Sequence, residues 1–476
     1  MGTAQTPTAQ ASSSYDWPTL AHDMARTGYT PVGPVGPYTK QWYRDFWSES
    51  GEEVADGYEP VAVHDTVHNL DLTYIGTATG SIYALNLANG ATFWRYPAPG
   101  QFIGGILSSP TVVNGIVYVA SLDGNVYALD STNVTNGVPA LLWKFSTGRQ
   151  GGFWGTPAVT ASGVYIGARD GFVYALDPAT GAKRWEYNTG APILMSPAVD
   201  ATKVYIGSES MHAFALSQSN GSLVWESSQL AGQTFRGSYP VLGDSLVFFR
   251  TAPNDDPHGP LGEGEQVLAY AAGCTTYPIH PELVNDRSNI SCFNWKAAAT
   301  SPMSYTVESQ AVTAYLSGAG YDGIPGRPQY ETFFALSQAT GQRPFIAPIL
   351  WTAGDANASE PPVVDGNGNV WVLYRTYYSD YDEPNAFIMD AFGRLDPTTG
   401  AITIRNPNPN PVGYSCDQYS CANPWSTNMW MIGDETTAYS VAGNRLYTGG
   451  AAYGSMDLNT GDLQSVFGRR EAVSWS

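Results

Sequence analysis

A single pattern of residues recurs along this chain: Tyr-x-Gly, Asp-Gly, Tyr-Ala-Leu-Asp, Thr-Gly and Trp, in that order. Its clearest copy runs from Val164 to Tyr187, and close copies begin at Tyr74, Val117 and Val204. Equivalent aromatic residues lie 44, 47 and 40 positions apart, at Tyr83, Tyr127, Tyr174 and Phe214. A period of this length is typical of β-propellers, in which each copy forms one four-stranded blade. The repeat therefore constrains the fold more than any single motif does.

The residues inside each copy predict strands and hairpins. Alternating apolar runs are separated by Asp-Gly, Asn-Gly and Thr-Gly turns, which leaves little room for helix. A tryptophan follows the last turn glycine by four residues, as in Gly90 to Trp94 and Gly181 to Trp185. We expect an aromatic side chain repeated at this position to pack between adjacent blades as a core residue.

Prolines that precede the first strand of each unit carry the period through the second half of the chain. These leading prolines are Pro60, Pro110, Pro157, Pro197, Pro240, Pro302 and Pro361. An eighth unit, Arg445 to Gly468, has no such proline. The sequence thus predicts an all-β fold: a single eight-bladed propeller over residues 15–476, with seven blades as the alternative. Lys40 to Trp47 resembles a last blade strand, so this N-terminal strand is expected to close the ring with the C-terminal blade.

Composition limits the possible partners. The chain has 22 Lys and Arg against 42 Asp and Glu, a net charge of −20, which would repel a nucleic acid. No apolar stretch is long enough to form a transmembrane segment. Residues 1–14 lack an apolar core, and we interpret them as a flexible tether, with an ordinary disordered terminus as the alternative. These features and the aromatic-rich composition predict an exported protein, extracellular, at the cell surface or periplasmic.

The four cysteines are consistent with an oxidising compartment. Of three possible connectivities we expect Cys274 with Cys292 and Cys416 with Cys421, and four free thiols are the alternative. Each disulfide would then staple an insertion, near residues 253–294 and 406–428 respectively.

The repeats resemble the pyrroloquinoline quinone (PQQ)-like propeller repeat family, within the quinoprotein alcohol dehydrogenase-like superfamily. The resemblance rests on Tyr174-Ala175-Leu176-Asp177, Thr180-Gly181 and Trp185, and on the opening Asp16-Trp17-Pro18 and Arg26-Thr27-Gly28. It implies the scaffold but not one function, because the family includes calcium- and PQQ-dependent alcohol dehydrogenases, an outer-membrane assembly lipoprotein that binds partners, and other secreted proteins. Those dehydrogenases share an adjacent Cys-Cys disulfide that this sequence lacks, which weakens the expectation of a PQQ cofactor.

In a propeller, the loops that lead into the innermost strands line one mouth of the central channel. The residues before the leading prolines are therefore expected to form a ring there: Glu59, Ser109, Thr156, Ser196, Tyr239, Ser301 and Glu360. Asp434 and Glu435 occupy the corresponding segment of the eighth unit. Glu59, Glu360 and either Asp434 or Glu435 would then converge on one side, where their oxygens suit calcium. The alternative is that these acids cap turns and face water.

The same loops add Trp154 as a stacking face and Arg236 as an anion contact for a planar or sugar-like ligand, unless they fill the channel as core. We favour a non-catalytic module that binds a protein, carbohydrate or small-molecule ligand through the mouth and the long loops. The alternative is a calcium- and PQQ-dependent dehydrogenase that oxidises an alcohol or sugar. A hydrolase or lyase acting on a polysaccharide through paired carboxylates is a third class.

Overall fold

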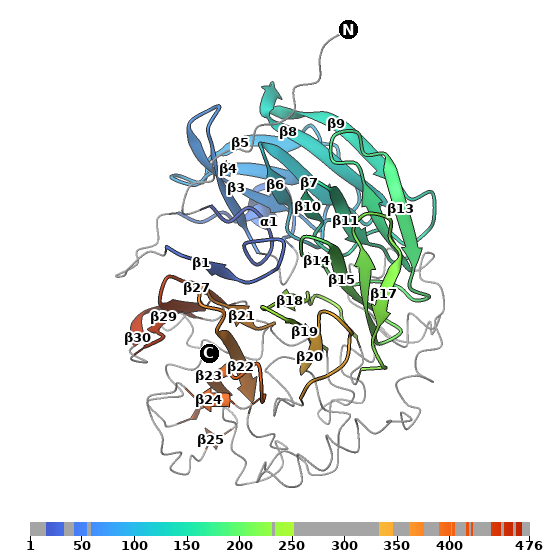
Figure 1. Ribbon diagram of the computed structural model, residues 1–476. Coiled ribbons are helices and arrows are strands. Elements are labelled where there is room, and N and C mark those ends of the chain that lie inside the picture. Colours follow the sequence, from blue (N-terminus) through green and yellow to red (C-terminus); the bar gives the residue numbers. More distant parts are fainter. Residues whose placement is uncertain are drawn as a thin grey trace.

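The computed structural model describes residues 16–32, 42–54, 59–230, 234–251, 333–345, 361–375, 390–400, 402–404, 416–417, 420–421, 439–448, 452–459 and 463–468. In these ranges the regular secondary structure is β-strand, apart from one short helix, α1 (Phe46–Ser50). The strands form seven sheets of three to five strands and one two-stranded sheet. Figure 1 shows the larger sheets following one another around a common centre, as the blades of a propeller do.

The first four blades are complete antiparallel meanders of four consecutive strands. Blade 1 contains β2 (Val61–Asp65), β3 (Leu70–Gly76), β4 (Ile82–Asn86) and β5 (Thr92–Tyr96). Blade 2 contains β6 (Thr111–Val113), β7 (Ile116–Ala120), β8 (Asn125–Thr135) and β9 (Val138–Ser146). Blade 3 contains β10 (Ala158–Thr160), β11 (Gly163–Gly167), β12 (Phe172–Leu176) and β13 (Lys183–Asn188). Blade 4 contains β14 (Ala198–Val199), β15 (Lys203–Ser208), β16 (His212–Ser217) and β17 (Leu223–Glu226).

The remaining blades come from the second half of the chain. Blade 5 contains β18 (Val241–Leu242), β19 (Leu246–Arg250) and β20 (Phe333–Ser337). Blade 6 contains β21 (Val363–Val364), β22 (Val370–Arg375), β23 (Asp390–Leu395) and β24 (Ile402–Ile404). Blade 7 contains β27 (Tyr439–Ala442), β28 (Arg445–Thr448), β29 (Ala452–Asp457) and β30 (Leu463–Gly468), with β1 (Tyr29–Thr30) added beside β27. Two further strands, β25 (Cys416–Asp417) and β26 (Ser420–Cys421), pair with each other.

The prediction of eight blades is wrong, because the described residues form seven. The prediction fails at Pro302, which the spacing of the leading prolines places at the start of a blade that contains the Phe-Ala-Leu strand at 333–337. That strand, β20, pairs with β19 through Phe248 and Ala335, so it belongs to the blade that begins after Pro240. Residues 251–332 are therefore a connection within blade 5. A proline inside this long connection mimicked the leading proline of a new blade.

The N-terminal strand that joins the C-terminal blade is β1, and not the segment Lys40 to Trp47. β1 pairs in parallel with β27 through Tyr29 and Val441. Part of the predicted strand is instead helix α1, whose first residue, Phe46, is buried against blade 1. The described helix has five residues, and no helix in the described part of the chain is long and apolar enough to cross a membrane.

Trp42, just before α1, nevertheless makes the contact of a last-strand tryptophan. Its indole N–H donates to the Leu87 carbonyl oxygen at 2.7 Å, and a Cβ added to Gly90 would lie 2.7 Å from its ring. Trp143 of blade 2 packs in the same way against Gly181 of blade 3. These glycines have φ near +70°, so they serve both the turn and the close approach of the indole. A tryptophan from the N-terminal segment thus supplies this contact to blade 1.

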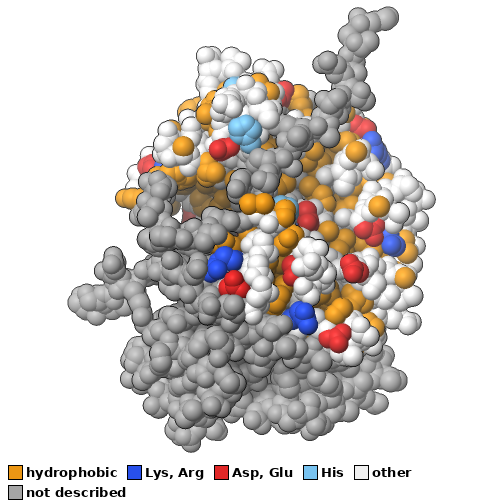
Figure 2. Space-filling view, turned by 60° about the vertical axis from the view of Figure 1, so that its left-hand side comes forward, with side chains coloured by type: hydrophobic (Ala, Val, Ile, Leu, Met, Phe, Trp, Pro, Cys, Tyr) orange, Lys and Arg blue, Asp and Glu red, His pale blue; other side chains and the backbone are white. Residues whose placement is uncertain are grey.

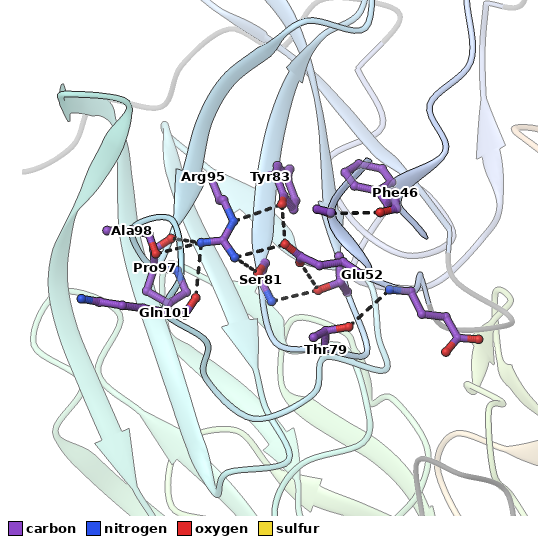
Figure 3. A network of polar contacts seen from close by, with 12 residues as sticks. Phe46, Glu52, Thr79, Ser81, Tyr83, Arg95, Pro97, Ala98 and Gln101 are labelled. Atoms are coloured by element: carbon purple, nitrogen blue, oxygen red, sulfur yellow. Dashed lines mark hydrogen bonds and ion pairs between the residues drawn. The ribbon is translucent and has the colours of Figure 1, made fainter. Parts of the chain in front are cut away.

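A buried polar network fastens the N-terminal segment to blade 1 (Figure 3). The Glu52 carboxylate accepts hydrogen bonds from the Tyr83 hydroxyl at 2.6 Å and from the Arg95 guanidinium at 3.1 Å. In blade 2 the equivalent hydroxyl, that of Tyr127, donates to Asp123 of the Asp-Gly turn. Blade 1 has Thr-Gly at that turn, and Glu52 supplies the missing carboxylate from outside the blade.

Candidate functional site

The centre of the ring is occupied by residues 17–30, named here the axial segment. It passes the innermost strand of each blade in the order of the blades. Its backbone partners are Ala62 for Trp17, Val112 for Pro18, Val199 for Met24, Leu242 for Ala25, Val364 for Thr27, Val441 for Gly28 and Gly443 for Thr30. At blade 3 the Val159 N–H donates to the Met24 sulfur at 3.1 Å. The chain itself therefore fills the middle of the ring.

The backbone of the axial segment turns sharply. Ala21, His22 and Arg26 have φ of 50°, 73° and 60°, and Gly28 has φ of 66°. Non-glycine residues rarely adopt this conformation, because it costs free energy that the surrounding contacts must offset. Hydrogen bonds to the ring supply such contacts at Ala21, Arg26 and Gly28.

Arg26 anchors the axial segment and is fully buried. Its guanidinium donates to Thr19 Oγ1 at 2.7 Å and to the Leu20 carbonyl oxygen at 2.8 Å within the segment. It also donates to the Pro197 carbonyl oxygen at 3.1 Å, at the start of blade 4, and reaches two carbonyl oxygens at the start of blade 3 at 3.5 Å. Burial lowers the pKa of Arg26 to about 10, so the side chain remains charged at neutral pH.

Glu59, predicted as a ligand of a metal or small molecule, contacts the axial segment. Its Oε2 atom accepts a hydrogen bond of 3.0 Å from the Ala21 N–H. Its backbone is tied to Ser109, whose hydroxyl donates to the Glu59 carbonyl oxygen at 2.8 Å. Burial raises the pKa of the Glu59 carboxyl, opposed by the Ala21 N–H and the charge of Arg26. This carboxylate therefore already has partners within the protein.

Other residues of the predicted ring also hydrogen-bond to their neighbours. The Thr156 N–H donates to Ser196 Oγ at 2.8 Å, and the Ser196 N–H donates to the Ser238 carbonyl oxygen at 3.2 Å. The hydroxyls of Thr156 and Ser238 are buried and have no hydrogen-bond partner among the described residues. Buried polar atoms of this kind usually bind water or a ligand atom. Blades 3 to 5 thus bury two hydroxyl groups whose partners lie outside the described residues or are water.

Trp154 and Arg236, both predicted as ligand contacts, contact each other. The Arg236 guanidinium lies 4.9 Å from the centre of the Trp154 ring, and that of Arg169 lies 5.8 Å from it. All three side chains are buried, with 4 to 7% of their surface exposed. Both arginines therefore make cation–π contacts with the indole, which is not an open stacking surface.

Glu209 belongs to this cluster and was missed by the sequence analysis. It lies in the turn between β15 and β16 and is 3% exposed. Its Oε1 atom accepts from the Phe235 N–H at 3.1 Å, and its buried Oε2 atom has no partner among the described residues. Burial raises the pKa of Glu209 to about 7, although the Phe235 and Thr234 hydrogen bonds and the charge of Arg236 lower it. Aligning this turn with that of blade 3, where Arg169 stands, would have singled it out.

The acids predicted to converge with Glu59 lie outside the described residues: Glu360, Asp434 and Glu435. In the part of the chain that the structure describes, no three His, Cys, Asp or Glu side chains form a group that could hold a metal ion. Glu59 is bonded to Ala21 beside a buried arginine, and Trp154 is covered by two more. The partners of Glu59 and Trp154 among the described residues thus come from the protein itself, and the calcium and PQQ sites remain predictions.

The predicted disulfides also remain predictions. Cys416 and Cys421 occupy directly opposite positions in the β25–β26 pair, but their side chains are outside the described part of the structure. Cys274 and Cys292 fall wholly outside it.

The repeats were compared with protein families and with known proteins. The family described as outer membrane protein assembly factor BamB matches residues 44–137 and 134–255. No curated protein matches the sequence significantly.

Several solved structures are similar in fold. BamB from Moraxella catarrhalis is 16% identical over 84% of this chain and 80% of its own, with a TM-score of 0.40. Quinohemoprotein alcohol dehydrogenase from Comamonas testosteroni is 13% identical over 95% and 72%, with a TM-score of 0.49. A europium-containing methanol dehydrogenase is 13% identical over 96% and 86%, with a TM-score of 0.52, and at this identity it supports the fold alone. The predicted resemblance is confirmed: residues 44–255 match the model of this repeat family.

Proposed function

We propose that this protein is an exported, non-catalytic propeller that binds a partner through the mouth of its ring and its long loops. The observation that carries the proposal is the axial segment, which fills the centre of the ring. A ligand must then be held at the mouth or by the loops, because the channel is occupied by the chain itself. The family description, an outer membrane assembly factor, supports a protein as the partner and the periplasm or cell surface as the location.

The surface is consistent with a protein partner. Figure 2 shows acidic and basic side chains of the described residues interspersed among hydrophobic and neutral ones on the face that it draws. Phe102, in the loop that leads into blade 2, is 50% exposed at the mouth. The Arg95 guanidinium lies 5.2 Å from its ring and holds it in place. Exposed aromatic side chains on an ordered support are frequent anchors of protein interfaces.

A photo-reactive amino acid at position 102, introduced in the producing cells, tests this proposal. We expect irradiation to yield one discrete cross-linked partner, identified by mass spectrometry. The matched control position is Leu223, which is 43% exposed on the outermost strand of blade 4, away from the mouth. Absence of any adduct from position 102, or the same set of adducts from both positions, would contradict a binding mouth.

The alternative function, a calcium- and PQQ-dependent dehydrogenase, is tested separately. Because the described mouth residues are bonded to one another, adding calcium and PQQ to the purified protein is expected to leave its thermal midpoint unchanged. A rise of several degrees, together with dye-linked oxidation of an alcohol or sugar, would favour the dehydrogenase instead.

A further inference from the structure

The axial segment connects the two ends of the ring. Trp17 exchanges two backbone hydrogen bonds with Ala62 of blade 1, at 2.6 and 3.0 Å. At its other end β1 pairs with β27 of blade 7 (Figure 1). Among the described strands, none of blade 1 pairs with a strand of blade 7. The segment therefore joins the first and last blades through a shared partner.

In most of these hydrogen bonds the N–H group belongs to the ring and the carbonyl oxygen to the axial segment. Outside the ladder of β1 with β27, seven N–H groups of the ring donate to carbonyl oxygens of the axial segment, and one N–H of the segment, that of Trp17, donates to the ring. The donors lie on the inner edges of the blades, where a strand has no further neighbour in its own sheet. Unpaired buried N–H groups are costly, so the inner edges need acceptor groups beside them, which the axial segment supplies.

Side chains fix the register of the segment in this position. The Arg26 guanidinium contacts carbonyl oxygens at the start of blades 3 and 4, and the Glu59 carboxylate of blade 1 accepts from the Ala21 N–H. Thr19 Oγ1 and Thr111 Oγ1 of blade 2 lie 2.7 Å apart. Four different blades thus contact side chains or backbone of one short stretch.

We propose that the inner edges of the blades form a binding surface for a segment of chain, and that residues 17–30 occupy it as an internal ligand that keeps the ring closed. Release of this segment and opening of the ring are then a single event. The covalent link through residues 33–41 is not needed for the segment to stay bound.

The experiment uses the full chain with a specific protease site inserted within residues 33–41. After cleavage, size-exclusion chromatography and mass spectrometry follow the N-terminal fragment at increasing urea concentrations, and circular dichroism follows the sheets. We expect the fragment to co-elute with the ring in buffer, and its release to share one urea midpoint with the loss of β-structure. Separation of the fragment in buffer, or at lower urea from a ring with unchanged circular dichroism, would overturn the proposal.

A pair of variants of the cleaved chain tests the anchor. Arg26→Ala should move release of the fragment to a lower urea concentration. Arg184→Ala is the control, because this side chain is 39% exposed and pairs with Asp177 at the surface. It should leave the urea concentration at which the fragment is released unchanged. If Arg26→Ala prevents folding, Arg26→Lys keeps the charge but loses most of the bonds and should show the same shift. Equal urea midpoints of release for the Arg26 and Arg184 variants would show that Arg26 does not hold the axial segment in the ring.

Discussion

The Arg26 guanidinium donates a hydrogen bond of 3.1 Å to the Pro197 carbonyl oxygen, across 171 residues of sequence. This bond links the axial segment to the start of blade 4, and the same guanidinium reaches blade 3. A charged group so deeply buried is stable only when its donors are paired. The pairing thus couples the conformation of the axial segment to the closure of the ring.

Replacing Arg26 in the intact chain should destabilise the protein. Arg26→Ala leaves the Leu20 and Pro197 carbonyl oxygens without their donor, and we expect the free energy of unfolding to fall by about 3 kcal/mol. Urea unfolding followed by tryptophan fluorescence measures the change. Arg184→Ala, at an exposed ion pair, should change it by less than about 1 kcal/mol. Equal effects of the two variants would show that the burial of Arg26 contributes nothing specific.

Glu209 should make stability depend on pH. Its pKa is raised to about 7 in the folded protein, above the ordinary value of 4.5, so between these pH values the folded state binds more protons than the unfolded state. Stability conferred by the protonated carboxyl is therefore present below pH 4.5 and is lost as pH rises through 7. Glu209→Gln removes this loss, and its free energy of unfolding relative to the parent should rise by on the order of 3 kcal/mol between pH 4.5 and pH 8. A difference that does not change with pH would contradict the raised pKa.

The Glu52 carboxylate should be essential to the attachment of α1. Glu52→Ala leaves the Arg95 guanidinium buried without its counter-charge, which typically costs about 3 kcal/mol or more. We expect loss of stability in urea and faster proteolysis of the segment around α1. Asp177→Asn, at a surface ion pair, is the matched control and should behave like the parent. Unchanged proteolysis of the Glu52 variant would mean that α1 is held by other contacts.

The contact between Trp143 and Gly181 can be separated from the conformational effect of glycine. Gly181 and Gly190 have φ of 70° and 81°, but a Cβ on Gly181 would lie 2.6 Å from the indole whereas one on Gly190 meets nothing within 4 Å. Gly190→Ala should therefore cost about 1 kcal/mol from its φ alone. Gly181→Ala should cost about 1–3 kcal/mol more, because the indole must also move. Similar thermal midpoints for the two variants would argue against this contact between blades.

Sequence reasoning succeeded where a blade is a continuous repeat and failed where it is interrupted. Blades 1 to 4 each have short turns, so their strands follow the period. In blade 5, 82 residues separate the end of β19 at Arg250 from the start of β20 at Phe333, and Pro302 within them imitated a new blade. Local patterns carry no information about which of two distant strands will pair.

The contacts at the mouth and centre of the ring likewise could not be predicted from local sequence. The motifs around Trp17 and Arg26 were recognised as family marks, but their partners are spread over all seven blades, and nothing near them in sequence predicts that path. The sequence predicts Trp154 and Arg236 as ligand contacts because each loop, taken by itself, carries a side chain suited to a ligand. Only their packing shows that they contact each other, with Glu209 beside them.

Amide hydrogen exchange on the inner strands tests the central claim most directly. The amides of Val112, Val199, Leu242, Val364 and Val441 all donate to carbonyl oxygens of the axial segment. We predict that these five amides exchange as slowly as those paired between strands within a blade, and that Arg26→Ala accelerates all five together. Exchange of these amides in the parent protein at the rate of exposed loops would show that the axial segment does not fill the centre of the ring.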